Sequence, residues 1–134
     1  MVTRVFDAKL ECLDDAISFV EEQLEACDCP MKTTMQITVC VEEMFVNVAH
    51  YAYEGREGTA TLSVDMVDDS VVIQLTDSGV PFDPLAKEDP DITLSAEERR
   101  IGGLGIFMVK KSMDSVHYER RDGENVFTMT KKLR

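Results

Sequence analysis

The 134-residue sequence predicts an α/β protein, because stretches of helical periodicity and stretches of strict alternation both occur in it. Two segments in the first half of the chain have helical periodicity, and two segments in which apolar and polar residues alternate follow them. A third helical segment and a closing hairpin complete the pattern. The length and the hydrophobic content of 44% predict a single domain, residues 1–134, with one core.

Two helices are predicted from apolar residues that recur every three or four positions. The first covers residues 13–26 and ends before a Cys-Pro pair that breaks the pattern. The second has Thr33 or Thr34 near its start and runs to about Ala52, before the segment YEGREG turns the chain. Their apolar rows are Leu13, Ile17, Val20 and Leu24 in the first helix, and Ile37, Val41, Met44, Phe45 and Val48 in the second.

Two hairpins are predicted from alternation and turn residues. In TATLSVDM, residues 59–66, apolar and polar side chains alternate strictly, as expected for a strand with one buried face. The segment VDDS then turns the chain into a second strand, VVIQLTDSG, which ends at an acidic corner containing a glycine. The last segment, SVHYERRDGENVFTMTKKL, is predicted to be a hairpin that turns at Asp122-Gly123.

Between these hairpins lies a long stretch, Val80 to Ile101, with three prolines and no sustained periodicity. It is longer than an ordinary connection, so it is predicted to be a functional lid or a mobile segment. It leads into GGLGIFMVKKSM, where glycines precede an apolar helix that is expected to start near Gly105.

Charge and composition exclude several classes of function. Fourteen basic residues stand against 26 acidic ones, a net charge of −12 with no basic stripe, which argues against a nucleic-acid partner. No run approaches the roughly 18 apolar residues of a membrane span, and the N-terminus is charged where a secretory signal would be apolar. We therefore expect a cytoplasmic protein. Its cysteines are expected to be reduced structural thiols: Cys12, Cys27, Cys29 and Cys40.

Three polar or glycine-rich motifs follow one another along the chain. Each is common for purely structural reasons when it occurs alone. Their order is a Glu-x-x-x-Asn on the second helix, an Asp-x-Gly after a strand, and a Gly-Gly-x-Gly at the end of the long segment. The residues are Glu43 and Asn47, Asp77 and Gly79, and Gly102, Gly103 and Gly105 with Leu104 between the last two. Together they predict one site.

This order of motifs resembles the ATP-binding fold shared by gyrase, the heat-shock chaperone of ninety kilodaltons, MutL and histidine kinases, the GHKL or Bergerat type. The resemblance implies a two-layer α/β sandwich, a mixed sheet with helices on one face. Within that superfamily the chain is most similar to the anti-sigma factors that are also serine-protein kinases. The segments NVAHYAY, DSGVPFDP and GGLGIFMVKKSMD carry this likeness, which extends from about residue 10 to the C-terminus.

The resemblance implies an ATP- and Mg²⁺-dependent anti-sigma factor with serine/threonine-protein kinase activity. It would bind a sigma factor and phosphorylate a small anti-anti-sigma protein of the STAS type. The resemblance also suggests a homodimer. Two other functions stay open. One is an ATP-binding module that sequesters a partner without phosphate transfer. The other is a detached histidine-kinase-type catalytic domain. The sequence argues against it, because it shows no dimerisation helix with a phosphoacceptor histidine.

Two residues on the second helix suit phosphate chemistry, because side chains at positions i and i+4 lie side by side. The amide oxygen of Asn47 is the kind of hard ligand that Mg²⁺ prefers. The carboxylate of Glu43 would then accept a proton from the attacking hydroxyl or align it, as a catalytic base. Both residues lie in a row that also contains Cys40, beside the buried face of the helix.

The other residues are expected to hold the nucleotide. A carboxylate at Asp77 accepts a hydrogen bond from the exocyclic amine of adenine, and Gly79 lets the backbone approach the base closely. The glycines around Leu104 are expected to hinge the lid and to aim free N–H groups and the positive end of the helix at the phosphates. Two further roles are each left open between two residues. Arg99 or Arg100, at the end of the lid, would offset the phosphate charge. By the resemblance, Thr128 or Thr130 on the last strand would face the nucleotide.

Overall fold

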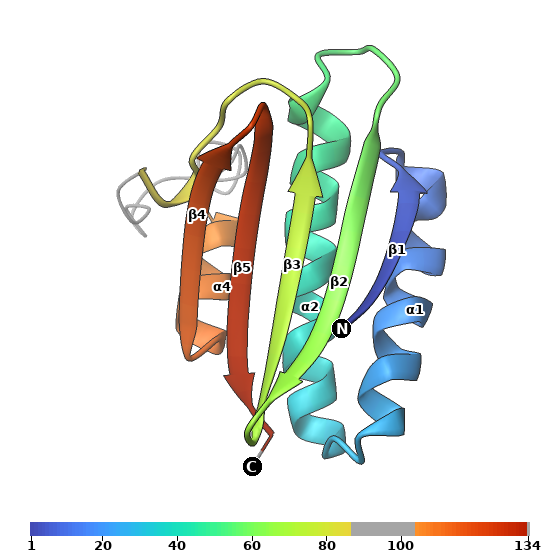
Figure 1. Ribbon diagram of the computed structural model, residues 1–134, viewed down its shortest axis with the longest axis vertical. Helices are drawn as coiled ribbons and strands as arrows, with labels where there is room; N and C mark the ends of the chain where they lie inside the picture. Colours follow the sequence, from blue (N-terminus) through green and yellow to red (C-terminus); the bar gives the residue numbers. More distant parts are fainter. Residues whose placement is uncertain (87–103, 134) are drawn as a thin grey trace.

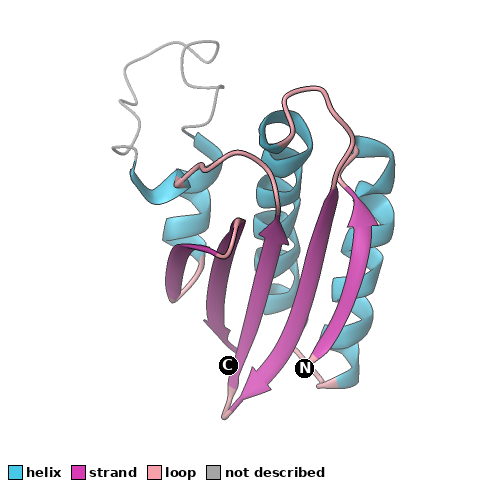
Figure 2. Ribbon diagram, turned by 45° about the horizontal axis from the view of Figure 1, so that its top comes forward, coloured by secondary structure: helices cyan, strands magenta, loops and turns pink. Residues whose placement is uncertain are grey.

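The computed structural model describes residues 1–86 and 104–133, and Figure 1 shows their arrangement. Most of the predicted lid, Arg99 and Arg100, and two of the glycines, Gly102 and Gly103, lie outside the described residues. The described part forms two layers, a five-stranded sheet and a layer of helices on one of its faces (Figure 2). The predicted two-layer α/β sandwich is therefore confirmed.

The sheet has the strand order β1-β2-β3-β5-β4. All four pairings of neighbouring strands are antiparallel, so the mixed sheet expected from the resemblance is corrected to an antiparallel one. After β3 the chain passes through α4 and continues into strand β4, which runs in the same direction as β3. Strand β5 then folds back from β4 into the space between them, and it runs antiparallel to both. The strands are β1 Val2–Asp7, β2 Thr59–Val67, β3 Ser70–Asp77, β4 Ser115–Arg121 and β5 Glu124–Lys132.

The helices match the predicted pattern closely. The first, α1, spans Leu13–Ala26, with a short 3₁₀ turn at Leu10–Cys12 before it. The second, α2, spans Met31–Asn47 and continues as a π-helical turn, η2, over Val48–Ala52, so the helical segment ends where it was predicted to end. A 3₁₀ turn, η3, covers Pro84–Ala86, and α4 covers Leu104–Ser112.

Strand β1 was not predicted from the sequence. Of its six residues only Phe6 is buried, so the segment has no alternating apolar pattern that would identify it. It is nevertheless a strand because it pairs along its whole length with β2, from Val2 opposite Val64 to Asp7 opposite Thr59. Phe6 then packs against the rings of Phe19 and Phe45 in the helix layer.

The core lies between the sheet and the helices, and the central strand β3 shows which side chains reach it. Its residues at odd positions are buried while those at even positions are only half-buried, because successive side chains on a strand point to opposite faces. The largest fully buried side chains are Val20, Leu24, Ile37, Cys40, Val41, Phe45, Leu62, Val71, Ile73, Leu75, Val109 and Met129. The same alternation places Asp77, at the end of β3, on the side of the helices.

The two ends of the helix layer are tied to the sheet by specific contacts. At the beginning of α2, the buried hydroxyl of Thr33 donates a hydrogen bond to the carbonyl of Leu133, at 3.0 Å, beyond the end of β5. At the other end of the same helical segment, the carbonyl of Ala52 accepts a hydrogen bond from the N–H of Val80, at 2.8 Å.

Among the described residues no helix is long and apolar enough to span a bilayer.

Candidate functional site

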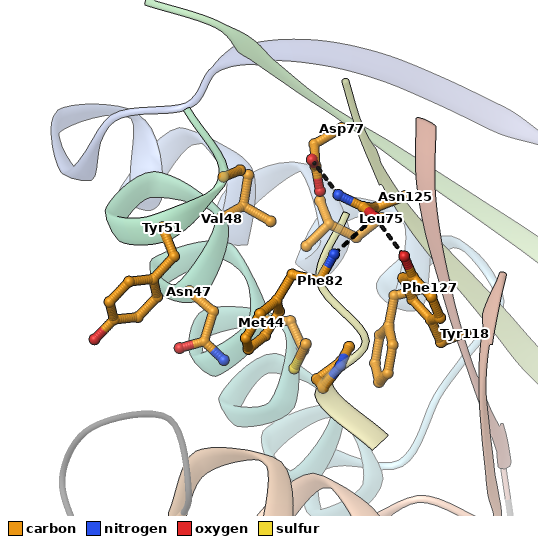
Figure 3. Close-up of a pocket in the computed structure, with 12 residues that line it drawn as sticks. Met44, Asn47, Val48, Tyr51, Leu75, Asp77, Phe82, Tyr118, Asn125 and Phe127 are labelled. Atoms are coloured by element: carbon orange, nitrogen blue, oxygen red, sulfur yellow. Dashed lines mark hydrogen bonds between the residues drawn. The ribbon is translucent and has the colours of Figure 1, made fainter. Parts of the chain in front are cut away.

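A pocket opens at the end of the sheet where β3 finishes and the α2–η2 segment ends. Its empty volume is about 430 Å³, a figure that includes the solvent-open space at its mouth. Figure 3 shows it between η2, β3, β5 and the chain that follows β3. It is lined by Met44, Asn47, Val48, Tyr51, Ala52, Leu75, Asp77, Phe82, Pro84, Tyr118, Asn125 and Phe127.

The lining is mostly apolar, with a few convergent polar groups. Among the described lining residues, carboxylate and amide groups come from Asn47 on α2, Asp77 on β3 and Asn125 on β5. Apolar and aromatic walls with a few fixed polar groups suit a flat heteroaromatic ring, which is bound by its faces and recognised at its edge. The structure brings together two of the residues selected from the sequence, because Asn47 and Asp77 both line this pocket.

Asp77 is the most deeply placed charged group of the pocket, with 6% of its surface exposed. Its Oδ1 atom accepts two hydrogen bonds, from the N–H of Gly79 at 2.9 Å and from Nδ2 of Asn125 at 2.9 Å. Both of these bonds go to the same oxygen. Within residues 1–86 and 104–133, no hydrogen bond reaches the second oxygen, Oδ2.

Gly79 is required for a reason different from the expected one. A Cβ atom at this position would lie 2.2 Å from the carbonyl oxygen of Ala52, so no side chain fits between the chain after β3 and η2. The neighbouring N–H of Val80 donates to that same carbonyl. The close approach that the glycine permits is thus an approach to Ala52, and Gly79 does not itself line the pocket.

The π-helical turn η2 shapes one wall of the pocket. Such turns are rare and occur often at functional sites, because the extra residue redirects the side chains that follow it. Here the wider turn contributes Val48, Tyr51 and Ala52 to the lining. Directly after it, the hydroxyl of Tyr53 donates to the carbonyl of Thr59 at 2.5 Å and accepts from the N–H of Ser78 at 2.9 Å. These bonds attach the end of the helix to the corner that carries Asp77.

The row on α2 has the burial that its position predicts. Cys40 is fully buried, while Glu43 and Asn47 are half-buried beside the core. Burial raises the pKa of the Cys40 thiol above its ordinary value, and the negative charge of Glu43 adds to that effect. Asn47 reaches the pocket, as Figure 3 shows, whereas Glu43 is outside its lining.

Glu43 instead contacts the first turn of α4. A Cβ atom added to Gly105 would lie 2.6 Å from Oε2 of Glu43, so the carboxylate rests against the backbone of this glycine. Helix α4 begins at Leu104, one residue before the expected start. Two predicted site residues from distant parts of the sequence, Glu43 and Gly105, are therefore brought together at a helix N-terminus, where partial positive charge is concentrated.

Thr128 and Thr130 do not reach the pocket. In the antiparallel register Thr128 lies opposite Gln74, and Nε2 of Gln74 donates to its hydroxyl at 3.3 Å. Gln74 and both threonines point to the face of the sheet opposite the core, which no helix of the described residues covers, because strand positions alternate and Phe127 and Met129 take the core face. The expectation that Thr128 faces the nucleotide is corrected by this register.

Asn125 is the residue of β5 that reaches the pocket, and the sequence reading did not select it. Its Nδ2 donates to Asp77, and its Oδ1 accepts from the N–H of Phe82 at 3.3 Å and from the hydroxyl of Tyr118 at 2.5 Å (Figure 3). A signal for it exists in the sequence, because Asn125 shares the face of Phe127 and Met129 and is the polar member of that row. The register that places it beside Asp77 is visible only in the structure.

The comparisons with known proteins agree with this geometry. The family described as "Histidine kinase-like ATPase domain" matches residues 6–131, which is nearly the whole chain. Among curated proteins, the chain is 27% identical over 95 residues to the serine/threonine-protein kinase BtrW of Bordetella bronchiseptica, covering 70% of this chain and 67% of that protein. It is 31% identical over 102 residues to the serine-protein kinase RsbW of Listeria monocytogenes, covering 72% of this chain and 64% of that protein.

Among solved structures, the chain resembles part of the chain in the crystal structure of the RsbU and RsbW domains of Rv1364c from Mycobacterium tuberculosis. The TM-score is 0.68 at 14% sequence identity, and the match covers 99% of this chain and 33% of that one. At this level of identity the likeness concerns the fold alone. The match spans about two thirds of the length of the two curated relatives.

Proposed function

Since the chain belongs to the histidine kinase-like ATPase family, we propose that it binds Mg-ATP in the pocket beside Asp77 and transfers the γ-phosphate to a serine or threonine of a partner protein. The observation that carries the proposal is the buried carboxylate in an apolar pocket, with one oxygen saturated by Gly79 and Asn125 and the other available. The names of the curated relatives, serine- and serine/threonine-protein kinases, support the choice of transfer over binding alone.

Asp77 gives the pocket its preference for adenine. A carboxylate oxygen only accepts hydrogen bonds, and the exocyclic amine of adenine donates one. Guanine would present a carbonyl oxygen at the same edge, which leaves two acceptors opposed at a buried position without a proton between them. Such an unpaired buried group costs about 1–3 kcal/mol. The apolar walls contribute to affinity for both purines, and Asp77 discriminates between them.

Asn47 is the residue proposed to hold Mg²⁺. Its side chain lines the pocket one helical turn beyond Glu43. Magnesium commonly takes one or two protein oxygens and completes its octahedron with water and phosphate oxygens, so one amide oxygen fits this role. When bound, the ion would offset the negative charge of the phosphates. The N–H groups of the first turn of α4 would act in the same direction.

Glu43 is proposed as the base that orients or deprotonates the attacking hydroxyl. Its carboxylate rests at the N-terminus of α4, beside Gly105, and so lies where the phosphate end of a nucleotide bound at Asp77 and Asn47 would arrive. A positioned base of this kind contributes about 10²- to 10⁴-fold to the rate of transfer. The helix terminus and the base would thus act on the same phosphate group.

The partners belong to the proposal as well. We infer a small anti-anti-sigma protein of the STAS type as the phosphate acceptor and a sigma factor as the protein that is sequestered. A homodimer is part of the same proposal. The protein would act in the cytoplasm, where ATP is present and where the free thiols of all four cysteines are kept reduced. The net charge of −12 favours a partner with a basic face over nucleic acid.

The test is incubation of the purified protein with Mg-ATP labelled at the γ-phosphate and with candidate anti-anti-sigma proteins encoded nearby. We expect label on a serine or threonine of one candidate, and none when Mg²⁺ is chelated. Binding of ATP and of a sigma factor without any labelled protein would support a module that acts by sequestration alone. Absence of ATP binding by calorimetry would reject both functions.

A further inference from the structure

We propose that Asn125 is a positioning residue that couples the base pocket to the chain that follows β3, so that a base bound at Asp77 also orders residues 80–86. The proposal rests on the proposed function, because it requires a nucleotide in the pocket. Its basis is that one buried side chain contacts both the carboxylate that would recognise the base and the backbone that leaves the site.

Asn125 uses all the hydrogen-bonding capacity of its amide. Its Nδ2 donates to Oδ1 of Asp77 at 2.9 Å and to the carbonyl of Val80 at 2.8 Å. Its Oδ1 accepts from the N–H of Phe82 at 3.3 Å and from the hydroxyl of Tyr118 at 2.5 Å. A side-chain amide has two N–H donors and two acceptor sites, so none is left over. The residue is 6% exposed, which makes each of these bonds costly to leave unmade.

The orientation of this amide is fixed by its backbone partners. The N–H of Phe82 can only donate, so it requires the oxygen of the amide, and the carbonyl of Val80 can only accept, so it requires the nitrogen. A flipped amide would lose both bonds. The same constraint forces Nδ2 toward Asp77, which keeps that carboxylate supplied with a donor at Oδ1 and leaves Oδ2 for the ligand.

The network also places an aromatic wall of the pocket. Phe82 and Met44 both line the pocket (Figure 3). Asn125 accepts a hydrogen bond from the backbone N–H of Phe82 and donates one to Asp77. The same side chain therefore positions both the acceptor for the base edge and one aromatic wall beside the base. A base that binds well must find both in place. By reciprocity, base binding must then stabilise the conformation of residues 80–86 that Asn125 holds.

Other contacts keep this segment near the pocket when the amide is removed. The N–H of Val80 donates to the carbonyl of Ala52, and Nη1 of Arg120 donates to the carbonyl of Gly79 at 2.8 Å. An Asn125 variant is therefore expected to retain the fold and the pocket, with a loosened segment after β3. This makes the coupling measurable separately from folding.

The first test compares the parent protein with Asn125→Ala, using Gln74→Ala on the uncovered face of β3 as a matched control. We expect Asn125→Ala to bind ATP at least about tenfold more weakly, the scale of one or more hydrogen bonds to a charged group. Hydrogen exchange at residues 80–86 should slow on ATP binding in the parent and in Gln74→Ala, and should stay fast in Asn125→Ala. Equal affinity and equal ATP-induced protection in Asn125→Ala would overturn the coupling.

The second test uses Asn125→Asp, which keeps the size of the side chain. Two carboxyl groups would then face each other where the amide now donates to Asp77, and this raises the pKa of one of them. Below that raised pKa the shared proton restores a donor to Asp77. We expect the ratio of variant to parent ATP affinity to rise as the pH is lowered from about 8 to about 6. A ratio that does not change with pH would contradict the role of the donated hydrogen bond.

The two proposals can fail separately. If the parent protein does not bind ATP, the proposed function is rejected and the coupling is rejected with it. If the parent binds ATP and Asn125→Ala binds it equally well, only the coupling is rejected. A lowered melting temperature of Asn125→Ala with unchanged affinity and unchanged protection would show that Asn125 has a structural role alone, which also overturns the coupling.

Discussion

The side chain of Asp77 combines two properties that conflict in an ordinary core residue, because it is charged and almost fully buried. A buried carboxylate is tolerated when donors compensate for the lost water, and here Gly79 and Asn125 supply two of them to one oxygen. The other oxygen is left for a ligand. Under the proposed function, a change at Asp77 therefore tests recognition of the base most directly.

We expect Asp77→Asn to weaken ATP binding by about 1–3 kcal/mol, the scale of a hydrogen bond to a charged group. An amide accepts less strongly than a carboxylate, and its N–H₂ group would oppose either the amine of adenine or Nδ2 of Asn125. Calorimetry with ATP gives the measurement. The control is Asp69→Asn, an exposed carboxyl just before the opposite end of β3, for which affinity should be unchanged. Equal affinity for Asp77→Asn and the parent would remove Asp77 from the base site.

Glu43 and Asn47 lie one turn apart on α2, yet their expected roles differ. We expect Glu43→Ala to retain most of the ATP affinity and to lose about 10²- to 10⁴-fold in phosphate transfer, because only the base is removed. Asn47→Ala should weaken Mg-ATP binding itself, because it removes the proposed metal ligand. A phosphorylation time course together with calorimetry separates the two. Transfer by Glu43→Ala at the rate of the parent would reject the assignment of the base.

At the scale of elements, the site is built where three chain segments end. Strand β3 ends at Asp77, the helical segment of α2 and η2 ends at Ala52, and α4 begins at Leu104. Glycines at two of these ends allow contacts that a side chain would block, with Ala52 at Gly79 and with Glu43 at Gly105. The two contacts differ in kind, because one neighbour is backbone and the other is the end of a flexible side chain.

Gly105→Ala is expected to separate stability from transfer. Alanine is favoured over glycine in a helix by about 0.5–1 kcal/mol, so the variant should be as stable as the parent or more stable. Its Cβ would lie 2.6 Å from Oε2 of Glu43, which must move away. We therefore expect an unchanged or higher melting temperature together with slower phosphate transfer. Unchanged transfer in a fully folded variant would show that the contact between Gly105 and Glu43 does not position the base.

At the scale of the whole molecule, a single core joins the helix layer to the sheet, and Cys40 lies inside it. Its thiol is 1% exposed, and burial raises its pKa above the ordinary 9.0, while a hydrogen bond with Ser112 opposes the shift. Burial also raises the pKa of Cys27, which is only half-buried. Ionisation of these two thiols at alkaline pH is therefore expected to lower the free energy of unfolding.

The sign of the linkage follows from the direction of the shift. Well below pH 9 the Cys40 thiol is protonated in the folded and the unfolded protein, so its contribution to stability is fully present. Above that pH the unfolded protein releases the proton first, and stability is lost as the pH rises toward the folded-state pKa. We expect Cys40→Ala, although less stable overall, to lose less stability than the parent between about pH 8 and about 10 in urea titrations. Parallel losses in both proteins would contradict this.

Much of the fold could be predicted because it is encoded locally. The bounds of α1, the end of the α2–η2 segment at Ala52 and the turn of the last hairpin at Asp122-Gly123 follow from periodicity and turn residues alone. Strand β1 could not be predicted in this way, because it is a strand only through its pairing with β2. The antiparallel order of the sheet was also missed, since nothing local shows that β5 inserts between β3 and β4.

The sequence by itself determined that helices and strands combine in an α/β fold, and that Asn47 and Asp77 stand in motifs typical of a nucleotide site, because such patterns depend on neighbours a few positions apart. Only the tertiary structure decided which strand residue completes the site. Thr128 and Asn125 differ by three positions on β5, so the alternation of the strand puts them on opposite faces. The register of β5 against β3 then brings Asn125 beside Asp77, and this register depends on the packing of the whole sheet against the helices.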